Sequence, residues 1–356
     1  MLINNNFCVC ALCKLNVFKL FIIIQLKMKD LICLGIESTA HTFGIGIITG
    51  KGKVLANITD SFKTEKGGLI PNELKKHHNE IKDKVLQEAL EKAKIKLDDI
   101  NLVSFSQGPG IQPALIVGLN FAKEIASKLK VPLVGVNHCV AHLEIGKLLT
   151  NAKDPVLLYT SGANTQVIAY ESGKYRIFGE TLDQGIGNFI DAFARYIGLG
   201  FPGGPKIEKL ALQSNNYIEL PYVVKGMDVS FSGILTNLKV KYDSKKYKIE
   251  DLCFSLQETV FAMMVEVSER AMAHTGKKEL LLGGGVACNK RLKEMCNIMC
   301  KERNAELFVP ENQYLVDNAV MIAWQGILQK NDAAEEYSKI DIKPYERTDD
   351  IKVAWK

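Results

Sequence analysis

The chain has 356 residues, of which 47% are hydrophobic and 24% charged, so it is not an intrinsically disordered protein and is long enough for two domains with their own cores. Its net charge of +5 permits a polyanionic partner but does not require one. The nine cysteines are odd in number and scattered, which argues against a secreted disulfide framework and favours a reducing cytoplasm.

Residues 1–27 differ in composition from the rest of the chain. They are rich in asparagine, then carry three closely spaced cysteines and a short apolar patch that is interrupted by polar residues. The patch is too short to span a bilayer and no small-residue cleavage site follows it, so we expect neither a membrane anchor nor a signal peptide. Because Met28 directly precedes the first strand, we interpret residues 1–27 as an N-terminal extension outside the fold.

The first half of the chain predicts a triplet of strands followed by helix, strand, helix and strand. Turns of small and polar residues separate these apolar segments. The expected strands are 31–37, 43–49, 54–60, 100–106 and 131–136, and the expected helices are 72–93, 113–128 and 138–149.

The second half repeats this order after residue 155, with a longer insertion. The expected strands are 156–160, 166–171, 175–180, 279–285 and 305–310, and the expected helices are 251–274 and two that start at 289 and 317. The repetition predicts a duplicated α/β unit with a cleft between its copies. We expect the first lobe to span 28–150 and the second 151–356, with the C-terminal tail packing back on the first lobe.

Three loops of small residues follow strand ends: "IESTAHT", "YTSGANT" and "LLGGGVACN". Exposed backbone N–H groups in such loops can bind phosphate oxygens, and glycine allows a close approach. Ordinary turns have the same composition. The matching positions of the first two loops in the two halves favour a nucleotide-like ligand.

His138 and His142 lie four residues apart after the strand 131–136. Asn137 is a good N-cap for a helix, so both imidazoles should project from one helix face while Cys139 points away. The positive end of the helix dipole should keep His138 neutral and able to bind a metal. The spacing fits half of a metal site, but it also fits two histidines that line an ordinary interface.

Six stretches together identify a resemblance to one family. They are "VNHCVAHLEIGK", "YTSGANTQVIAY", "GETLDQGIGNFIDAFARYIGLGFPGGPKIEKLA", "YVVKGMDVSFSGILT", "LLGGGVACNKRLKEM" and "VDNAVMIAW". In this order they closely resemble the tRNA N6-adenosine threonylcarbamoyltransferases of the archaeal and eukaryotic type, the catalytic subunits of KEOPS complexes. The resemblance covers about residues 31–355. It implies a two-lobed actin/Hsp70-like (ASKHA) fold with a central nucleotide cleft.

The resemblance also implies site residues. A divalent metal ion is expected on His138, His142, Tyr159 and Asp317; iron (Fe²⁺) is the ion usually assigned in this family, with Zn²⁺ or Mn²⁺ as alternatives in vitro. Threonylcarbamoyl-adenylate is expected to bind at Tyr159, Thr160, Ser161, Gly162, Ala163, Asp191, Gly204, Glu208 and Asn289. Without the resemblance, Asp191 and Glu208 would be interpreted as solvated charges, Asn289 as a helix cap and Gly204 as a turn residue.

The implied reaction transfers the threonylcarbamoyl group from the adenylate to N6 of adenosine 37 in tRNAs that read ANN codons, and it needs no covalent nucleophile. The implied partners are tRNA and separate KEOPS subunits, including a small protein kinase or ATPase; no membrane is involved. The sequence departs from the family's pattern at Gln184 and at Ala319, neither of which is a ligand position.

Two other activities remain as alternatives. A metalloprotease would use the two histidines, but "HCVAH" lacks the glutamate that follows the first histidine in H-E-x-x-H enzymes, and Glu144 does not share the face of His142. A phosphotransferase of the actin/Hsp70-like class would phosphorylate a small molecule, which no motif here specifically requires.

Overall fold

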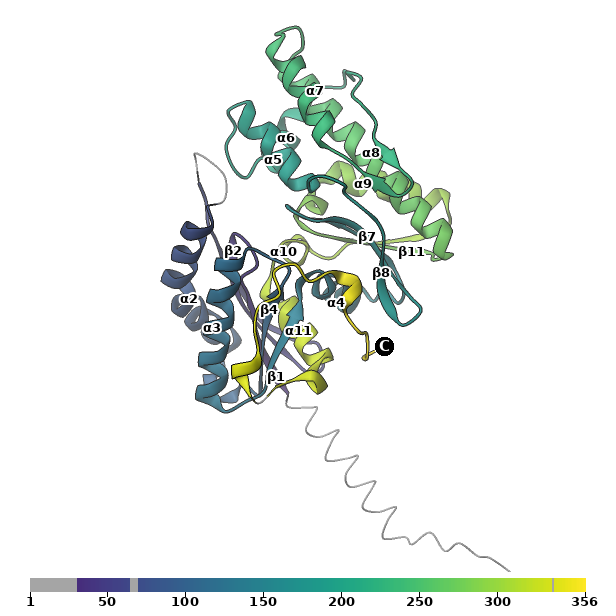
Figure 1. Cartoon of the computed structure of the whole chain (residues 1–356). Coiled ribbons are helices and arrows are strands. Elements are labelled where there is room, and N and C mark those ends of the chain that lie inside the picture. The colour runs from purple at the N-terminus through teal and green to yellow at the C-terminus, as the bar shows by residue number, and fades with distance from the viewer. Residues whose placement is uncertain (1–30, 65–69, 335) are drawn as a thin grey trace, which may run out of the picture.

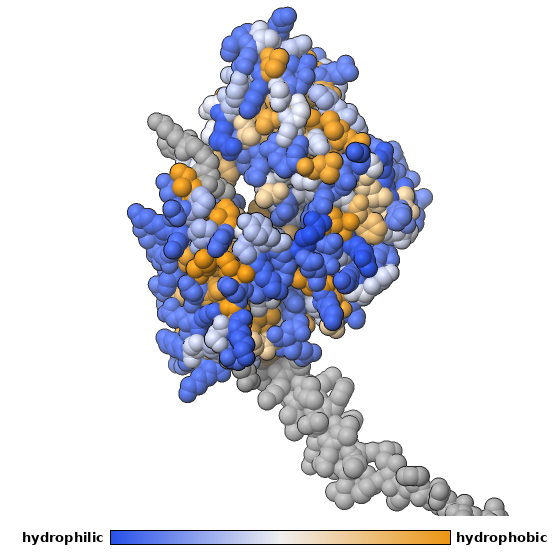
Figure 2. Space-filling model, in the orientation of Figure 1, coloured by the Kyte–Doolittle hydropathy of each residue, from blue (hydrophilic) through white to orange (hydrophobic). Residues whose placement is uncertain are grey.

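The computed structural model describes residues 31–64, 70–334 and 336–356, and the N-terminal extension proposed at 1–27 lies outside them. Figure 1 shows two halves, each built on one sheet, stacked one above the other. In the space-filling view a notch separates the halves on one side (Figure 2). No helix among the described residues is long and apolar enough to cross a membrane.

The first sheet has the strand order β3-β2-β1-β4-β5. Strand β1 pairs antiparallel with β2 and parallel with β4. The strands are β1 (Ile32–Glu37), β2 (Thr42–Thr49), β3 (Val54–Ser61), β4 (Leu102–Gly108) and β5 (Leu133–Asn137). Helices α2 (Pro71–Ala93) and α3 (Gln112–Leu129) cover one face of this sheet, and a 3₁₀ turn, η1 (Leu97–Asp99), leads into β4.

The second sheet repeats this order in its own strands, β12-β11-β6-β7-β8, which confirms the predicted duplication. Its strands are β6 (Val156–Thr160), β7 (Thr165–Glu171), β8 (Lys174–Glu180), β11 (Glu279–Gly283) and β12 (Glu306–Phe308). The inserted segment and the C-terminal part supply α5 (Ile186–Tyr196), α6 (Gly204–Ala211), the hairpin β9 (Val224–Lys225) and β10 (Asp228–Val229), α7 (Ser232–Asp243), α8 (Ile249–Thr275), η2 (Gly285–Cys288), α9 (Lys290–Glu302), α10 (Asn312–Leu315) and α11 (Ala319–Leu328).

Helices α4 (His138–Thr150) and α11 lie between the two sheets. Apolar residues of α4 contact the first sheet on one side and the second sheet on the other. Helix α11 packs so closely on β1 and β2 that a Cβ atom on Gly35 would lie 2.3 Å from the Ala323 nitrogen, and one on Gly46 would lie 2.3 Å from the Ala319 carbonyl carbon. A division at residue 150 therefore describes the two sheets but not α11, which comes from the second half of the sequence.

The C-terminal tail (336–356) runs across both halves (Figure 1). Near its start, the Tyr337 hydroxyl donates to the Val131 carbonyl at 2.7 Å, on the first half. Further on, Arg347 pairs with Glu180 on β8 at 3.1 Å, on the second half. Two 3₁₀ turns, η4 (Tyr337–Lys339) and η5 (Thr348–Asp350), shape the tail, and η3 (Lys330–Asp332) precedes it. The tail thus has contacts with both halves.

Candidate metal centre and adenylate site

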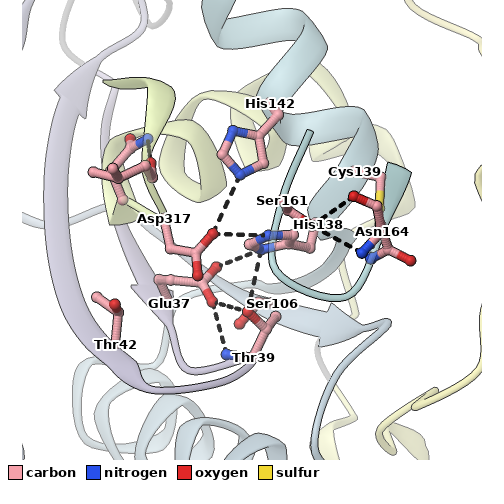
Figure 3. Close-up of polar contacts among 12 residues, drawn as sticks. Glu37, Thr39, Thr42, Ser106, His138, Cys139, His142, Ser161, Asn164 and Asp317 are labelled. Atoms are coloured by element: carbon pink, nitrogen blue, oxygen red, sulfur yellow. Dashed lines mark hydrogen bonds and ion pairs between the residues drawn. The ribbon is translucent and has the colours of Figure 1, made fainter. Parts of the chain in front are cut away.

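The two histidines of α4 lie where the halves meet. The Asn137 side chain accepts hydrogen bonds from the Cys139 and Val140 backbone nitrogens, so it caps the helix as the sequence predicted. One turn of helix separates His138 and His142, whose ring centroids are 4.8 Å apart, and both side chains are buried. Cys139 turns toward Asn164, away from the histidines' common face (Figure 3).

Asp317 comes to the same point from a position 175 residues after His142. Its carboxylate oxygen Oδ1 lies 3.3 Å from Nε2 of His138 and 3.5 Å from Nε2 of His142 (Figure 3). The expected helix starts later than predicted, at Ala319, and Asp317 precedes it. The fully buried Asn318 side chain binds the Met321 nitrogen and the carbonyls of Tyr314 and Val316, which fixes the turn that presents Asp317.

Tyr159 reaches this cluster from the end of β6. Its ring centroid is 5.0 Å from that of His142, and the side chain is fully buried. Among the residues that the structure describes, the Tyr159 hydroxyl and both ring nitrogens of His142 have no hydrogen-bond partner, and the nearest acceptor to Nε2 is the Asp317 carboxylate at 3.5 Å. A buried polar atom without a partner costs about 1–3 kcal/mol, so such atoms call for a ligand that the protein itself does not supply.

A divalent cation fits this cluster. One ligand atom from each of His138, His142 and Asp317 lies within 4.8 Å of the others, and the Tyr159 ring lies 5.0 Å from that of His142. Nitrogen and oxygen donors of this kind suit a borderline or hard divalent ion. Burial raises the pKa of Tyr159 well above its usual value, so a bound cation would be needed to make its oxygen a phenolate.

Glu37, at the end of β1, holds the ring of His138. Its Oε2 lies 2.9 Å from Nδ1 of His138, and its Oε1 accepts hydrogen bonds from the Thr39 backbone nitrogen and hydroxyl (Figure 3). A carboxylate on the far nitrogen orients a metal-binding imidazole and raises its basicity. Glu37 and Thr39 were missed by the sequence analysis, although both stand in the small-residue loop "IESTAHT".

The expectation that His138 is neutral because of the helix dipole is wrong for the protein without a bound ion. Burial lowers the pKa of His138, but the carboxylates of Glu37 and Asp317 outweigh burial and raise it well above its usual value. Burial also lowers the pKa of His142, and there no carboxylate reverses the effect. The burial of Asp317 raises its pKa, but the two imidazoles lower it well below the usual range. A cation would have to displace the proton on His138.

The loop after β6 folds against the start of α5. Its residues Thr160, Ser161, Gly162 and Ala163 go from buried to exposed, and the Gly187 and Asn188 nitrogens donate to the carbonyls of Ser161 and Gly162. The backbone approaches closely: a Cβ on Gly284, whose φ is +89°, would lie 2.4 Å from the Thr160 carbonyl. The glycine-rich loop after β11 therefore lies directly beside the loop after β6.

The other predicted adenylate residues belong to neighbouring segments of the second half. Asp191 Oδ1 accepts a hydrogen bond from the Gly203 nitrogen at 2.7 Å, and burial raises the pKa of Asp191. Glu208 Oε1 accepts from the Lys290 nitrogen at 2.9 Å. The Asn289 side chain caps α9 and donates to Gln257 at 2.6 Å. A Cβ on Gly204 would meet no atom of the described residues within 4 Å, so among these residues there is space at the start of α6.

Comparison with known proteins gives the chain's relatives. Residues 53–324 match the family model described as tRNA N6-adenosine threonylcarbamoyltransferase. The protein of that name from Thermococcus kodakarensis is 55% identical over 326 residues, which are 91% of this chain and 100% of the relative. A probable bifunctional tRNA threonylcarbamoyladenosine biosynthesis protein from Methanocaldococcus jannaschii is 49% identical over 326 residues, 91% of this chain but 60% of the longer relative.

Solved structures resemble this chain in fold alone. HypF from Thermococcus kodakarensis aligns with a TM-score of 0.59 at 15% identity, covering 87% of this chain and 49% of HypF. Component A of the (R)-2-hydroxyglutaryl-CoA dehydratase from Acidaminococcus fermentans aligns with a TM-score of 0.53 at 14% identity, covering 85% of this chain and 99% of that protein. These neighbours have the actin/Hsp70-like (ASKHA) fold, which confirms the predicted fold class.

Proposed function

Because this chain belongs to the tRNA N6-adenosine threonylcarbamoyltransferase family, we propose that its donor is threonylcarbamoyl-adenylate and its acceptor is N6 of adenosine 37 in tRNAs that read ANN codons. The amine attacks the carbamoyl carbon, and a new C–N bond forms. The C–O bond to the phosphate breaks and AMP leaves with the electron pair, while the amine proton passes to solvent. The product is N6-threonylcarbamoyladenosine.

The donor carries its own leaving group, so the chain's residues have to position and stabilise rather than attack. The exposed loop residues Gly162 and Ala163 and the open space at Gly204 are available to the adenylate. Asp191, Glu208 and Asn289 hold the backbone around that space through the hydrogen bonds described above. The acceptor adenosine lies in the single-stranded anticodon loop, where a base can turn into a cleft without breaking a duplex.

The metal cluster is the feature of the structure that supports catalytic activity in this chain. His138, His142, Tyr159 and Asp317 would hold one divalent ion, and iron is our proposal for its identity. When bound, the ion would supply a fixed positive charge that can stabilise the phosphate or carbonyl oxygens of the donor. The buried polar atoms of His142 and Tyr159 that lack a hydrogen-bond partner among the described residues are the observation that supports it most strongly.

We further propose that the chain works in the cytoplasm as the catalytic subunit of a KEOPS-type complex, with a separate kinase or ATPase subunit. A net charge of +5 spread over 356 residues supplies few phosphate contacts. Affinity for RNA depends steeply on the number of such contacts, so partner subunits should contribute much of the tRNA affinity.

The metalloprotease alternative gains no support from Glu144. This buried carboxylate accepts hydrogen bonds from Trp355 Nε1 and Lys147 Nζ, both at 2.8 Å, and from the Tyr175 hydroxyl. It is therefore committed to the packing of the C-terminal tail. A general base for peptide hydrolysis would have to come from elsewhere.

The direct test mixes the purified chain, separately synthesised threonylcarbamoyl-adenylate and an ANN-decoding tRNA, with and without KEOPS partners. Digestion and mass spectrometry should then detect N6-threonylcarbamoyladenosine. The matched control is the same tRNA with guanosine at position 37, which should stay unmodified. No product from the adenine tRNA in the presence of all partners would contradict the proposal.

A further inference from the structure

A second group of histidines lies on α2, outside the metal centre. His77 Nε2 lies 3.0 Å from Oδ1 of Asp60 on β3, and His77 Nδ1 lies 3.1 Å from Nδ1 of the next residue, His78. On the other side of its ring, His78 Nε2 lies 3.1 Å from the carbonyl oxygen of Ala40. These contacts form a continuous chain from a half-exposed aspartate to the loop between β1 and β2.

The groups at the two ends of this chain are hydrogen-bond acceptors, so they determine which histidine nitrogens carry protons. A carbonyl oxygen only accepts, so His78 must carry its proton on Nε2. Burial lowers the pKa of the fully buried His78 to about 4, so the ring is neutral and its Nδ1 is an acceptor. His77 must therefore donate from Nδ1 to His78 and from Nε2 to the Asp60 carboxylate. The hydrogen bonds therefore run outward from His77, to Asp60 at one end and through His78 to Ala40 at the other.

Aromatic contacts hold both rings in place. Phe62 meets the His77 ring nearly at right angles, with centroids 5.8 Å apart. Phe43 lies against His78 at 5.4 Å. The fully buried His78 ring thus contacts Phe43 and His77, and its two nitrogens lie within hydrogen-bond distance of His77 and Ala40. A buried donor of this kind positions the group to which it is bonded, because losing the bond would leave a polar atom unpaired.

One of the residues next to Ala40, Thr39, is linked to the metal cluster, and the other, His41, is linked to the proposed adenylate segment. Thr39 donates to Glu37, which holds the His138 ring of the metal cluster. His41 crosses to the second half, where its ring meets Phe201 edge-on at a centroid distance of 5.6 Å. Phe201 begins the short segment that leads to Gly203, which is bonded to Asp191, and to the open position at Gly204.

We propose that His41 is a positioning residue of the transfer reaction, which holds the segment 201–204 of the second half in its adenylate-binding position, and that the His77–His78 pair fixes the backbone from which His41 projects. The inference rests on the proposed binding of the adenylate at this segment. His41 acts through Phe201 and not through contact with the reacting atoms. Its loss should therefore weaken donor binding more than it slows the chemical step.

The test measures KM for threonylcarbamoyl-adenylate, KM for tRNA, kcat, bound metal and melting temperature in four variants, with the KEOPS partners present. His41→Ala should raise the KM for the adenylate about tenfold, the loss of one good contact, with the KM for tRNA, metal content and melting temperature unchanged. His78→Leu removes the donor to Ala40 and should also raise the KM for the adenylate but not that for tRNA, with a lower melting temperature because the Ala40 carbonyl loses its partner. His78→Gln, which can still donate an N–H to Ala40, should recover most of it.

His274→Ala is the matched control, because this ring packs on Phe178 of the second half, far along the chain from the segment 201–204. It should leave the KM for the adenylate unchanged. An unchanged adenylate KM in His41→Ala would overturn the inference, as would equal changes in both KM values. Since His41 is only partly buried, this variant decides the question even if His78→Leu fails to fold. If the unmodified enzyme transfers no threonylcarbamoyl group, the proposed function fails instead, so the two failures are distinguishable.

Discussion

The metal cluster and the proposed adenylate site use polar side chains in opposite ways. In the cluster, the Tyr159 hydroxyl and Nδ1 of His142 are buried without a hydrogen-bond partner among the described residues, and Nε2 of His142 has only the Asp317 carboxylate 3.5 Å away, so the cluster can accept a ligand. In the adenylate site, Asp191, Glu208 and Asn289 already bind backbone nitrogens. The first set is built to hold something from outside the chain, whereas the second holds the chain itself in shape. The metal residues and these adenylate residues therefore perform two kinds of work.

The largest effect should come from Asp317→Ala. Without this carboxylate the two histidines lose their shared partner, and we expect loss of the bound ion and a fall in transfer activity of at least about 100-fold. The fold should survive, because Asn318 and not Asp317 fixes the turn. Metal analysis, the transfer assay and circular dichroism melting check this. A variant that keeps its metal but loses its activity would contradict the separation of the two sites.

Glu37→Gln should have the next largest effect. Gln retains the size of the side chain but removes the negative charge that holds the proton on His138 Nδ1, and loss of such a partner typically costs about 10- to 100-fold in metal affinity. Competition with a chelator measures that affinity. The control is Glu88→Gln on the exposed surface of α2, which should bind the metal as the unaltered chain does. Equal affinities in all three proteins would exclude Glu37 from the centre.

Gly203 and Gly204 are adjacent but should respond differently to an added side chain, because only Gly204 has open space beside it. A Cβ on Gly203 would lie 2.4 Å from Cβ of Ala194, so Gly203→Ala should destabilise the fold by about 1–3 kcal/mol. Gly204 has open space, so Gly204→Ala should keep its stability and raise the KM for the adenylate about tenfold by occupying part of the ligand's volume. Denaturant unfolding and steady-state kinetics separate the two. The distinction fails if Gly204→Ala is the less stable variant, or if its KM is unchanged.

The smallest effect should follow removal of residues 1–27. A chain that begins at Met28 should keep its melting temperature, its metal content and its transfer activity, because the predicted fold begins with the strand after that methionine. Differential scanning calorimetry and metal analysis compare the two chains. A clear drop in either quantity would show that the extension packs on the core.

Local patterns were sufficient to predict much of this structure. The order of strands and helices, the Asn137 cap and the shared face of His138 and His142 all follow from residue spacing and capping chemistry. Asp317 could be assigned only by resemblance, because its partners lie 175 residues or more away in the sequence. The carboxylate of Glu37 decides the protonation of His138, and no helix-dipole argument could have included it.

The placement of α11 shows the same limit. Its sequence reads as one more helix of the second half, yet it packs on the first sheet because Gly35 and Gly46 leave room for its backbone. Those glycines stand in two different strands, so only the folded sheet brings them to one surface. The His77–His78 chain is likewise invisible in sequence, since its acceptor is the backbone carbonyl of Ala40.

The central claim is that one divalent ion is held at the junction of the two halves by residues of both. Anomalous X-ray diffraction from crystals of the full chain grown with Fe²⁺ under reducing conditions tests it most directly. The account predicts one strong anomalous peak about 2.0–2.2 Å from Nε2 of His138 and His142 and from oxygens of Tyr159 and Asp317. A peak elsewhere, or no peak in crystals whose protein carries metal in solution, would contradict it.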